Sequence, residues 1–333
     1  MFKRISFLII TLIFVLGAST AAWSDDFYKG KSIKLIVPYP PGGGTDTFSR
    51  LVARYMPTYI PGKPTIIVQN ILGASGIVAL NYLYNIAKPD GLTIGHTSVP
   101  GVRDQLVGAE GVKHDYATFE YIGSGGPTLQ LLAIRSALPY KSFADLKKAD
   151  KTLFMAAGSV ASTQAVLAAI LRHEGVPIKV VTGYRGSAPR VQALVKGEAD
   201  TTTVILMQIK QEKESLRPIF WVSVKGPELT DLPRLEELPL SAETRSFIKA
   251  VTAPLTAART FLAPPKTPKD RLRILQKAFE QTIKSDEFMK VATKLNLGPR
   301  YFSAKETKAL YVSVLNTPPE SVATLKRILK KSQ

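Results

Sequence analysis

A strand, a glycine turn and a helix follow one another in the stretch IKLIVPYPPGGGTDTFSRLVAR, residues 33–54, and no other stretch constrains the fold as strongly. The aliphatic run 33–37 is typical of a buried strand. Three prolines between residues 38 and 41 end sheet pairing, because proline has no N–H to donate. The glycines 42–44 allow backbone conformations that a Cβ would forbid. The Thr-Asp pair 45–46 favours the start of a helix, since its oxygens can accept N–H groups there.

A glycine turn that leads into a helix can bind an anion. The first N–H groups of the helix have no partner within it, and the helix dipole adds partial positive charge. The other interpretation is a tight strand–helix connection that holds no ligand. The stretch has neither the Gly-Lys-Ser/Thr of a P-loop nor the spacing of G-x-G-x-x-G.

Strands and helices alternate further along the chain. We expect strands at 65–69, 92–95, 152–156, 178–181 and 200–206, and helices at 77–87, 164–174 and 188–196. This alternation predicts an α/β fold with two mostly parallel sheets covered by helices. Ligands of such sheets bind outside the carboxyl ends of the strands.

The last third of the chain has a different pattern. Proline-rich loops are expected at 217–239, and a linker at 263–268. Four helices should follow, at 269–284, 286–296, 304–315 and 320–331. We expect this helical tail to pack back on the first αβ unit.

The N-terminus has the pattern of a secretory signal peptide. Lys3 and Arg4 precede the apolar run FLIITLIFVL, and Ala22-Trp23-Ser24 offers a cleavage site. An apolar run of 10 residues is too short to cross about 30 Å of hydrocarbon. The chain has no cysteine, so neither lipid attachment nor a disulfide is available. We expect an exported, periplasmic and soluble protein that is stabilised by its core alone.

The protein is strongly basic, with a formal net charge of +18. Removal of residues 1–24, which hold two basic residues and no acidic one, leaves +16. Such a surface attracts anions. Nucleic acid is not an expected partner, because the sequence has no arginine-rich run, aromatic–basic ladder, finger or helix-turn-helix pattern. The basic run 326–331 fits a solvated helix face.

Neither a metal centre, a cofactor nor a catalytic group is expected. His96, His114 and His173 are scattered, and no HExxH or cysteine pair occurs. The Gly-x-Ser-x-Gly elbow of a serine hydrolase is missing. A pairing of Ser162 with His173 is conceivable, but nothing in the sequence brings the two together. We therefore expect no enzyme, and an exported hydrolase is the less favoured alternative.

The order of several motifs resembles one family, the Bug-type (TctC-like) solute-binding proteins of tripartite tricarboxylate transporters. The likeness lies in IVPYPPGGGTD (36–46), IIVQNILGASGIVALNYLYNIAKPDGLTI (66–94), VVTGYRGSAPRVQALVKGEAD (180–200) and FLAPPKTPKDRLRILQKAF (261–279). Each motif is weak alone, whereas their order and spacing are specific. The resemblance implies a type II periplasmic-binding-protein fold, in which two αβ domains enclose a ligand cleft. After a signal peptide at 1–24, domain 1 would comprise 25–122 and 251–333, and domain 2 would comprise 123–250.

The resemblance also implies a set of ligand-binding residues for a small carboxylate. In the first domain these are Tyr39, Gly43, Gly44, Thr45, Asp46 and Ser98. In the facing loops they are Gly158, Ser159, Ser162, Thr163, Tyr184, Arg185 and Gly186. The facing loop departs from the family pattern, since Ala161 and Ala165 stand where a glycine and a histidine are usual. Because of this departure, the sequence does not predict which chemical group the ligand carries away from its anchored carboxylate.

Three of these residues have a second interpretation. Asp46 would repel an anion, so we favour a role in capping the helix and ordering the glycine turn. It could instead orient a water or meet a ligand ammonium group. Arg185 could bind a carboxylate through its two-pronged guanidinium or be solvated. Tyr184 could donate to the ligand or pack in its turn.

The resemblance implies a receptor that passes a small organic acid to integral membrane transporter subunits. We expect a monomer, although the sequence leaves the oligomeric state open. The same fold also serves receptors that present a bound ligand to a two-component sensor. The sequence does not separate the two uses.

Overall fold

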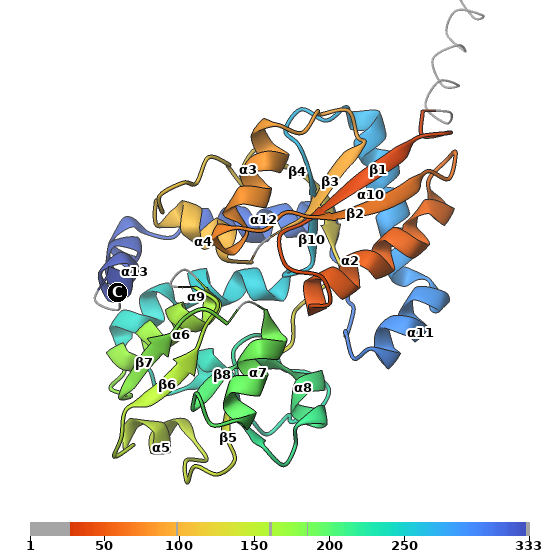
Figure 1. Ribbon diagram of the computed structural model, residues 1–333. Helices are drawn as coiled ribbons and strands as arrows, with labels where there is room; N and C mark the ends of the chain where they lie inside the picture. Colours follow the sequence, from red (N-terminus) through yellow and green to blue (C-terminus); the bar gives the residue numbers. More distant parts are fainter. Residues whose placement is uncertain (1–26, 98, 160–161, 185, 331–333) are drawn as a thin grey trace, which may run out of the picture.

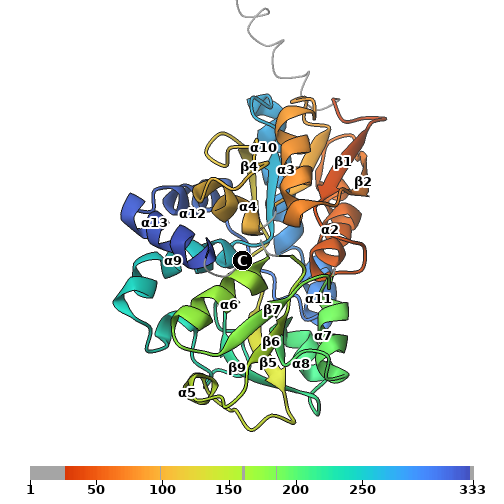
Figure 2. The same ribbon diagram turned by 60° about the vertical axis from the view of Figure 1, so that its left-hand side comes forward.

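The computed structural model describes residues 27–97, 99–159, 162–184 and 186–330, which form two lobes with a five-stranded sheet in each (Figures 1 and 2). The predicted α/β class is confirmed, but the expectation of mostly parallel sheets is wrong, because each sheet has two parallel and two antiparallel strand pairs. The predicted signal peptide, at residues 1–24, lies outside the described residues. No helix in the described part of the chain has the length and apolar character needed to cross a membrane.

The first sheet has the strand order β2-β1-β3-β10-β4. Its strands are β1 (Ser32–Val37), β2 (Thr65–Asn70), β3 (Thr93–His96), β4 (Glu120–Ser124) and β10 (Thr260–Ala263). β1 pairs in parallel with β2 and β3, whereas β10 runs antiparallel between β3 and β4. The strands expected at 33–37, 65–69 and 92–95 are thereby confirmed.

Helices cover both faces of the first sheet (Figure 1). One face carries α2 (Gly44–Tyr55), α10 (Lys269–Lys284) and α11 (Asp286–Lys294), and the other carries α3 (Ile77–Asn85), α4 (Val99–Leu106) and α12 (Ala304–Leu315). Alternate residues of β1, beginning with Ile33, are fully buried beneath Phe48 of α2. Every second side chain of β1 therefore packs against the apolar face of α2.

The second sheet has the order β7-β6-β8-β5-β9. Its strands are β5 (Gln130–Arg135), β6 (Leu153–Ala156), β7 (Ile178–Val181), β8 (Thr201–Ile205) and β9 (Leu216–Trp221). The helices around it are α5 (Phe143–Lys147), α6 (Thr163–His173), α7 (Ser187–Val195), α8 (Leu206–Gln211) and α9 (Ala242–Thr256). α5, α6 and α9 share one apolar core, and α7 and α8 pack on the opposite face.

The expectation of loops alone at 217–239 is wrong. β9 occupies the start of this range even though it contains Pro218. β9 lies at the edge of the sheet, where a strand tolerates a residue that cannot donate a hydrogen bond. The pairing with β5 also shifts register between Leu132 and Ala133, beside this proline. α9 was not predicted, although Ser241 caps it by accepting a hydrogen bond from the Thr244 N–H.

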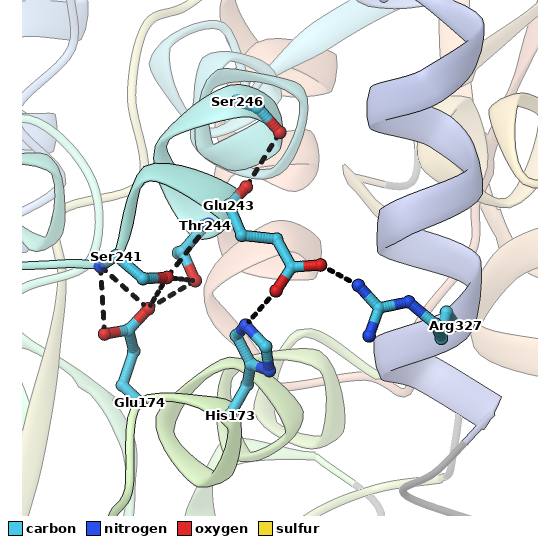
Figure 3. Close-up of polar contacts among 7 residues, drawn as sticks. All are labelled: His173, Glu174, Ser241, Glu243, Thr244, Ser246 and Arg327. Carbon is cyan, nitrogen blue, oxygen red and sulfur yellow. Dashed lines mark hydrogen bonds and ion pairs between the residues drawn. The ribbon is translucent and has the colours of Figure 1, made fainter.

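The C-terminal helix α13 (Pro319–Lys330) does not follow the rest of the tail. Its Leu325 and Ile328 join the core of the second lobe, whereas α10, α11 and α12 pack on the first sheet as expected. An ion pair between Arg327 and Glu243 of α9 holds the helix there, and Glu243 also pairs with His173 of α6 at 2.9 Å (Figure 3). The expectation that the whole tail packs on the first domain is therefore wrong for α13. The domain boundaries stay predictions; residue 122 falls within β4 and residue 250 within α9.

Candidate ligand-binding site

The glycine turn after β1 is held in shape by Asp46, whose side chain is only 2% exposed. Asp46 Oδ2 accepts the Gly42 N–H at 2.9 Å and the Arg50 Nε–H at 2.8 Å. Its Oδ1 accepts the Asn70 Nδ2–H at 2.9 Å. These contacts fit the predicted role of Asp46 in ordering the glycine turn. The predicted capping role is wrong, because the N-cap residue of α2 is Gly43 and no side chain caps the helix.

Asn70 is a site residue that the sequence analysis missed. It ends β2, next to β1, and its Nδ2 also donates to the Tyr39 carbonyl at 2.8 Å. Arg50 closes the group by donating to Asn70 Oδ1 at 3.2 Å. The sequence could have indicated Asn70 by its position, because a residue at the end of a strand parallel to β1 lies at the same sheet edge as the turn after β1.

The electrostatics of Asp46 agree with a structural role. Burial alone raises the pKa of this carboxyl, but the hydrogen bonds from Arg50, Asn70 and the Gly42 N–H outweigh burial and lower the pKa below its ordinary value. Asp46 is therefore ionised at neutral pH and already bound by donors on both oxygens.

The start of α2 leaves two N–H groups for a ligand. The Gly42 N–H donates to Asp46 and is not available to a ligand. Within the described residues, the N–H groups of Gly43 and Gly44 have no hydrogen-bond acceptor. No heavy atom lies within 4 Å of where a Cβ on Gly44 would be, and the nearest to one on Gly43 is 3.7 Å away. The space beside both glycines, next to Thr45, is therefore open on the Cβ side.

The facing turns of the second lobe lie side by side. A Cβ on Gly158 would be 3.5 Å from the Tyr184 carbonyl, and the Tyr184 N–H donates to Ala157 at 3.2 Å. Ser162 caps α6, because its Oγ accepts the Ala165 N–H and donates to the Ser159 carbonyl at 2.8 Å. Its hydroxyl is therefore committed to the turn. Thr163 is the first residue of α6, and Gly186 is the uncapped start of α7.

Contacts link the two lobes at these turns. Ser75 Oγ, from the loop after β2, lies 2.7 Å from Ser159 Oγ of the second lobe. Tyr39 is also close enough to Arg190 of α7 to raise the pKa of that guanidinium, although burial has the larger effect and lowers it to about 10. The structure thus brings the first loop and the facing turns together. Ser98 and Arg185 lie outside the described residues, so their roles stay predictions.

Arg259 is a second residue that the sequence analysis missed. It lies where the chain crosses between the lobes, and its backbone pairs with the other crossing through Gly125 and Gly126. Its guanidinium covers the Phe48 ring at 4.7 Å, and burial lowers its pKa to about 9. Beside it, His96 is neutral, since burial lowers its pKa to about 3.

A cavity of about 420 Å³ lies away from these loops, between residues 222–224, α9 and α12. Its lining includes Arg234, Glu236 and Lys249, and none of the predicted site residues. Within the described residues, no group of three or more His, Cys, Asp or Glu could hold a metal ion.

Comparisons with known proteins identify the family of this chain. The family described as "Tripartite tricarboxylate transporter family receptor" (TctC) matches residues 50–326. The "UPF0065 protein in tcbD-tcbE intergenic region" of Pseudomonas sp. (strain P51) is 26% identical over 289 residues, which cover 84% of this chain and 82% of that protein.

Solved structures share the two-lobed architecture of this chain. The periplasmic binding protein BugD has a TM-score of 0.68 at 21% identity, covering 92% of this chain and 98% of that chain. Rpa4515 of R. palustris, solved with adipate, has a TM-score of 0.69 at 22% identity, covering 89% and 97%. At these identities the likeness establishes the fold, a two-lobed periplasmic-binding-protein fold. Because the family match spans most of its length, the chain belongs to the TctC family and is a Bug-type solute-binding protein.

Proposed function

We propose that this protein is an exported, periplasmic receptor that captures a small carboxylate-bearing organic anion between its lobes and delivers it to membrane transporter subunits. The observation that carries the proposal is the start of α2, where Gly43 and Gly44 hold N–H donors without acceptors among the described residues. The second lobe meets the first through the turn that holds Ser159, whose Oγ lies 2.7 Å from Ser75 Oγ. Relatives support the ligand class, since a family neighbour was solved with adipate.

The geometry suits reversible capture. Asp46 and Asn70 order the glycine turn before any ligand arrives, which reduces the entropy lost on binding. The positive end of the α2 dipole adds to the attraction for an anion. Neutral donors release the anion again when the cleft opens, and no covalent step is needed.

Closure would follow capture by a hinge motion at the crossings between the lobes. The contact between Ser75 and Ser159 closes one edge of the cleft. Exclusion of water then strengthens the charged hydrogen bonds to the ligand.

Thermal unfolding of the purified protein with a panel of small acids, at one salt concentration, tests the proposal. A ligand that binds only the folded state stabilises it by about 2.7 kcal/mol at a hundredfold excess over Kd. We expect stabilisation by one or two carboxylates and none by their amides or methyl esters. Equal effects of acids and amides would contradict anion capture. Gly43→Asp serves as the site variant, because a carboxylate in the turn should abolish the stabilisation.

A further inference from the structure

The cavity of about 420 Å³ beside α9 has walls from both lobes. The second lobe contributes residues 222–224, which follow β9, and the short 3₁₀ helix η3 (Leu235–Glu237), whose Leu235 is part of the core of that lobe. The first lobe contributes the end of α12, whose Val314 is part of a first-lobe core. α9 lies between these walls and has residues in both cores. A cavity of this size can hold a small molecule.

Three crossings of the chain between the lobes border this cavity. In the first, the Thr128 carbonyl accepts a hydrogen bond at 2.8 Å from the Oγ of Ser223, which lines the cavity. Thr256 also lines the cavity, and it ends α9 directly before the second crossing. Thr317 lines the cavity in the third crossing, between α12 on the first lobe and α13 on the second. A rotation of one lobe against the other must therefore change the shape of the cavity.

The lining combines one free cation with several hydrogen-bond acceptors. Lys249 of α9 is exposed, and its ammonium group has neither a hydrogen bond nor an ion pair among the described residues. Ser313 and Thr317 donate their own hydroxyl protons to carbonyls of α12, at 2.7 and 2.6 Å. Their oxygens therefore remain as acceptors for a ligand.

Glu236 supplies a further acceptor from the second lobe. It accepts the hydroxyl of Thr252, which shares a face of α9 with Lys249 three residues earlier. Its ion pair with Arg234 is long, at 3.8 Å, because the Arg234 Nε donates to Glu237 at 2.8 Å. Lys249 is thus the cation left for a ligand, and it lies beside oxygens that need donors.

We propose that this cavity is a second binding site, called the pivot site, which takes a small polyhydroxy acid and regulates the motion of the lobes. The carboxylate of the ligand pairs with Lys249, and its hydroxyls donate to Glu236 on one lobe and to Ser313 and Thr317 on the other. A ligand held by both lobes prefers one angle between them, because rotation moves its partners apart. Such a preference is what allows a ligand to shift a conformational equilibrium and to alter affinity at another site.

Calorimetric titration with three probes of equal chain length tests the chemistry of the pivot site. Gluconate carries a carboxylate and hydroxyls, hexanoate carries only the carboxylate, and sorbitol carries only hydroxyls. We expect gluconate to bind about tenfold or more tightly than either of the others, since each of them lacks one set of hydrogen bonds. Gluconate should bind Gly43→Asp within about threefold of the wild type, because the glycine turn is not part of this cavity.

Lys249→Gln is the site variant. It should weaken gluconate binding by about tenfold or more, because it removes a charged hydrogen bond. Lys213→Gln is the matched control, since Lys213 is another exposed lysine of the second lobe and does not line the cavity. The control should change the affinity by no more than about twofold, because exposed charges are screened.

Spin labels measure the effect on the lobes. The chain has no cysteine, so Lys277→Cys on α10 and Lys148→Cys at the end of α5 place one label on each lobe at an exposed position. We expect gluconate to shift or narrow the distribution of distances between the labels, and the same labels in a Lys249→Gln chain to respond only at about tenfold higher concentration or more.

The outcomes separate the pivot site from capture in the cleft. Absence of gluconate binding, equal binding of hexanoate, loss of binding in Gly43→Asp, or full binding by Lys249→Gln would each overturn the pivot site. Binding with an unchanged distance distribution would overturn its regulatory role. The receptor proposal survives each of these results, and the pivot site likewise survives a failure of the acid panel to stabilise the protein through the cleft.

Discussion

Replacing Asp46 by asparagine sets two effects against each other. The substitution removes a negative charge beside an anion site, which by itself should tighten binding of an acid. It also removes one of the two acceptors that order the glycine turn, because asparagine has only one acceptor oxygen and its NH₂ group would face either Asn70 or the donors Gly42 and Arg50. We expect the second effect to be larger.

The magnitude follows from the contacts of Asp46. The bonds from Gly42 and Asn70 are partly buried and contribute about 0.5–1.5 kcal/mol each, whereas the Arg50 side chain is 50% exposed and its ion pair adds little. An unpaired donor left behind adds a penalty of about 1 kcal/mol or more. Whichever way the amide is oriented, one of these bonds is lost and its donor is left unpaired. Asp46→Asn should therefore lower the free energy of unfolding by about 1.5–2.5 kcal/mol, and acid affinity by about tenfold as the turn loses its order.

Urea unfolding and calorimetric titration with the best-binding acid measure both quantities. Asp286→Asn is the control, since Asp286 also lies in the first turn of a first-lobe helix but is exposed. It should leave affinity unchanged. Tighter binding by Asp46→Asn would refute the reasoning, because it would show that the charge of Asp46 acts on the ligand more strongly than its hydrogen bonds act on the turn.

Three further predictions concern stability and closure. Glu174→Gln should lower the free energy of unfolding, measured with urea at pH 7, by about 2 kcal/mol. Burial raises the pKa of Glu174, but the hydrogen-bond donors at the start of α9 outweigh burial and lower the pKa (Figure 3). The stabilisation by Glu174 is therefore present above the ordinary pKa and should vanish as the pH falls through the lowered pKa. An unchanged difference between wild type and variant well below that pH would contradict this. Gly125→Ala should destabilise the protein by about 1–3 kcal/mol, because the new Cβ would lie 2.2 Å from the Phe48 ring. Adding Phe48→Leu to the same chain should restore part of the lost stability. Equal losses with and without Phe48→Leu would contradict this. Ser75→Ala should weaken acid binding by about two- to fivefold without effect in a Ser159→Ala background, since the pair at 2.7 Å closes the cleft; additive effects in the double mutant would refute the coupling.

Local chemistry made the first αβ unit predictable. Prolines and glycines between β1 and α2 mark the turn, and an acid two residues after the glycines was sufficient to propose that it orders them. The order of strands and helices followed from hydrophobic periodicity, which needs no tertiary information.

The features that were missed depend on contacts distant in sequence. β10 is a short strand before a proline pair, and only its neighbours β3 and β4 make it a strand. The helical pattern of α13 was correct, but its place is set by Glu243 on α9. Whether an arginine is buried is likewise a tertiary property, so nothing in the sequence distinguishes Arg259 from the solvated arginines.

Amide chemical shifts of the α2 turn test the central claim most directly. In protein labelled with ¹⁵N-glycine, the acid that stabilises the fold should shift the N–H resonances of Gly43 and Gly44 most strongly, because these donors would meet the anion. Gly42 should move less, since its N–H already donates to Asp46. Saturable shifts at Gly226, near the cavity lined by Val224, with none at Gly43 and Gly44, would place the ligand elsewhere and contradict the account.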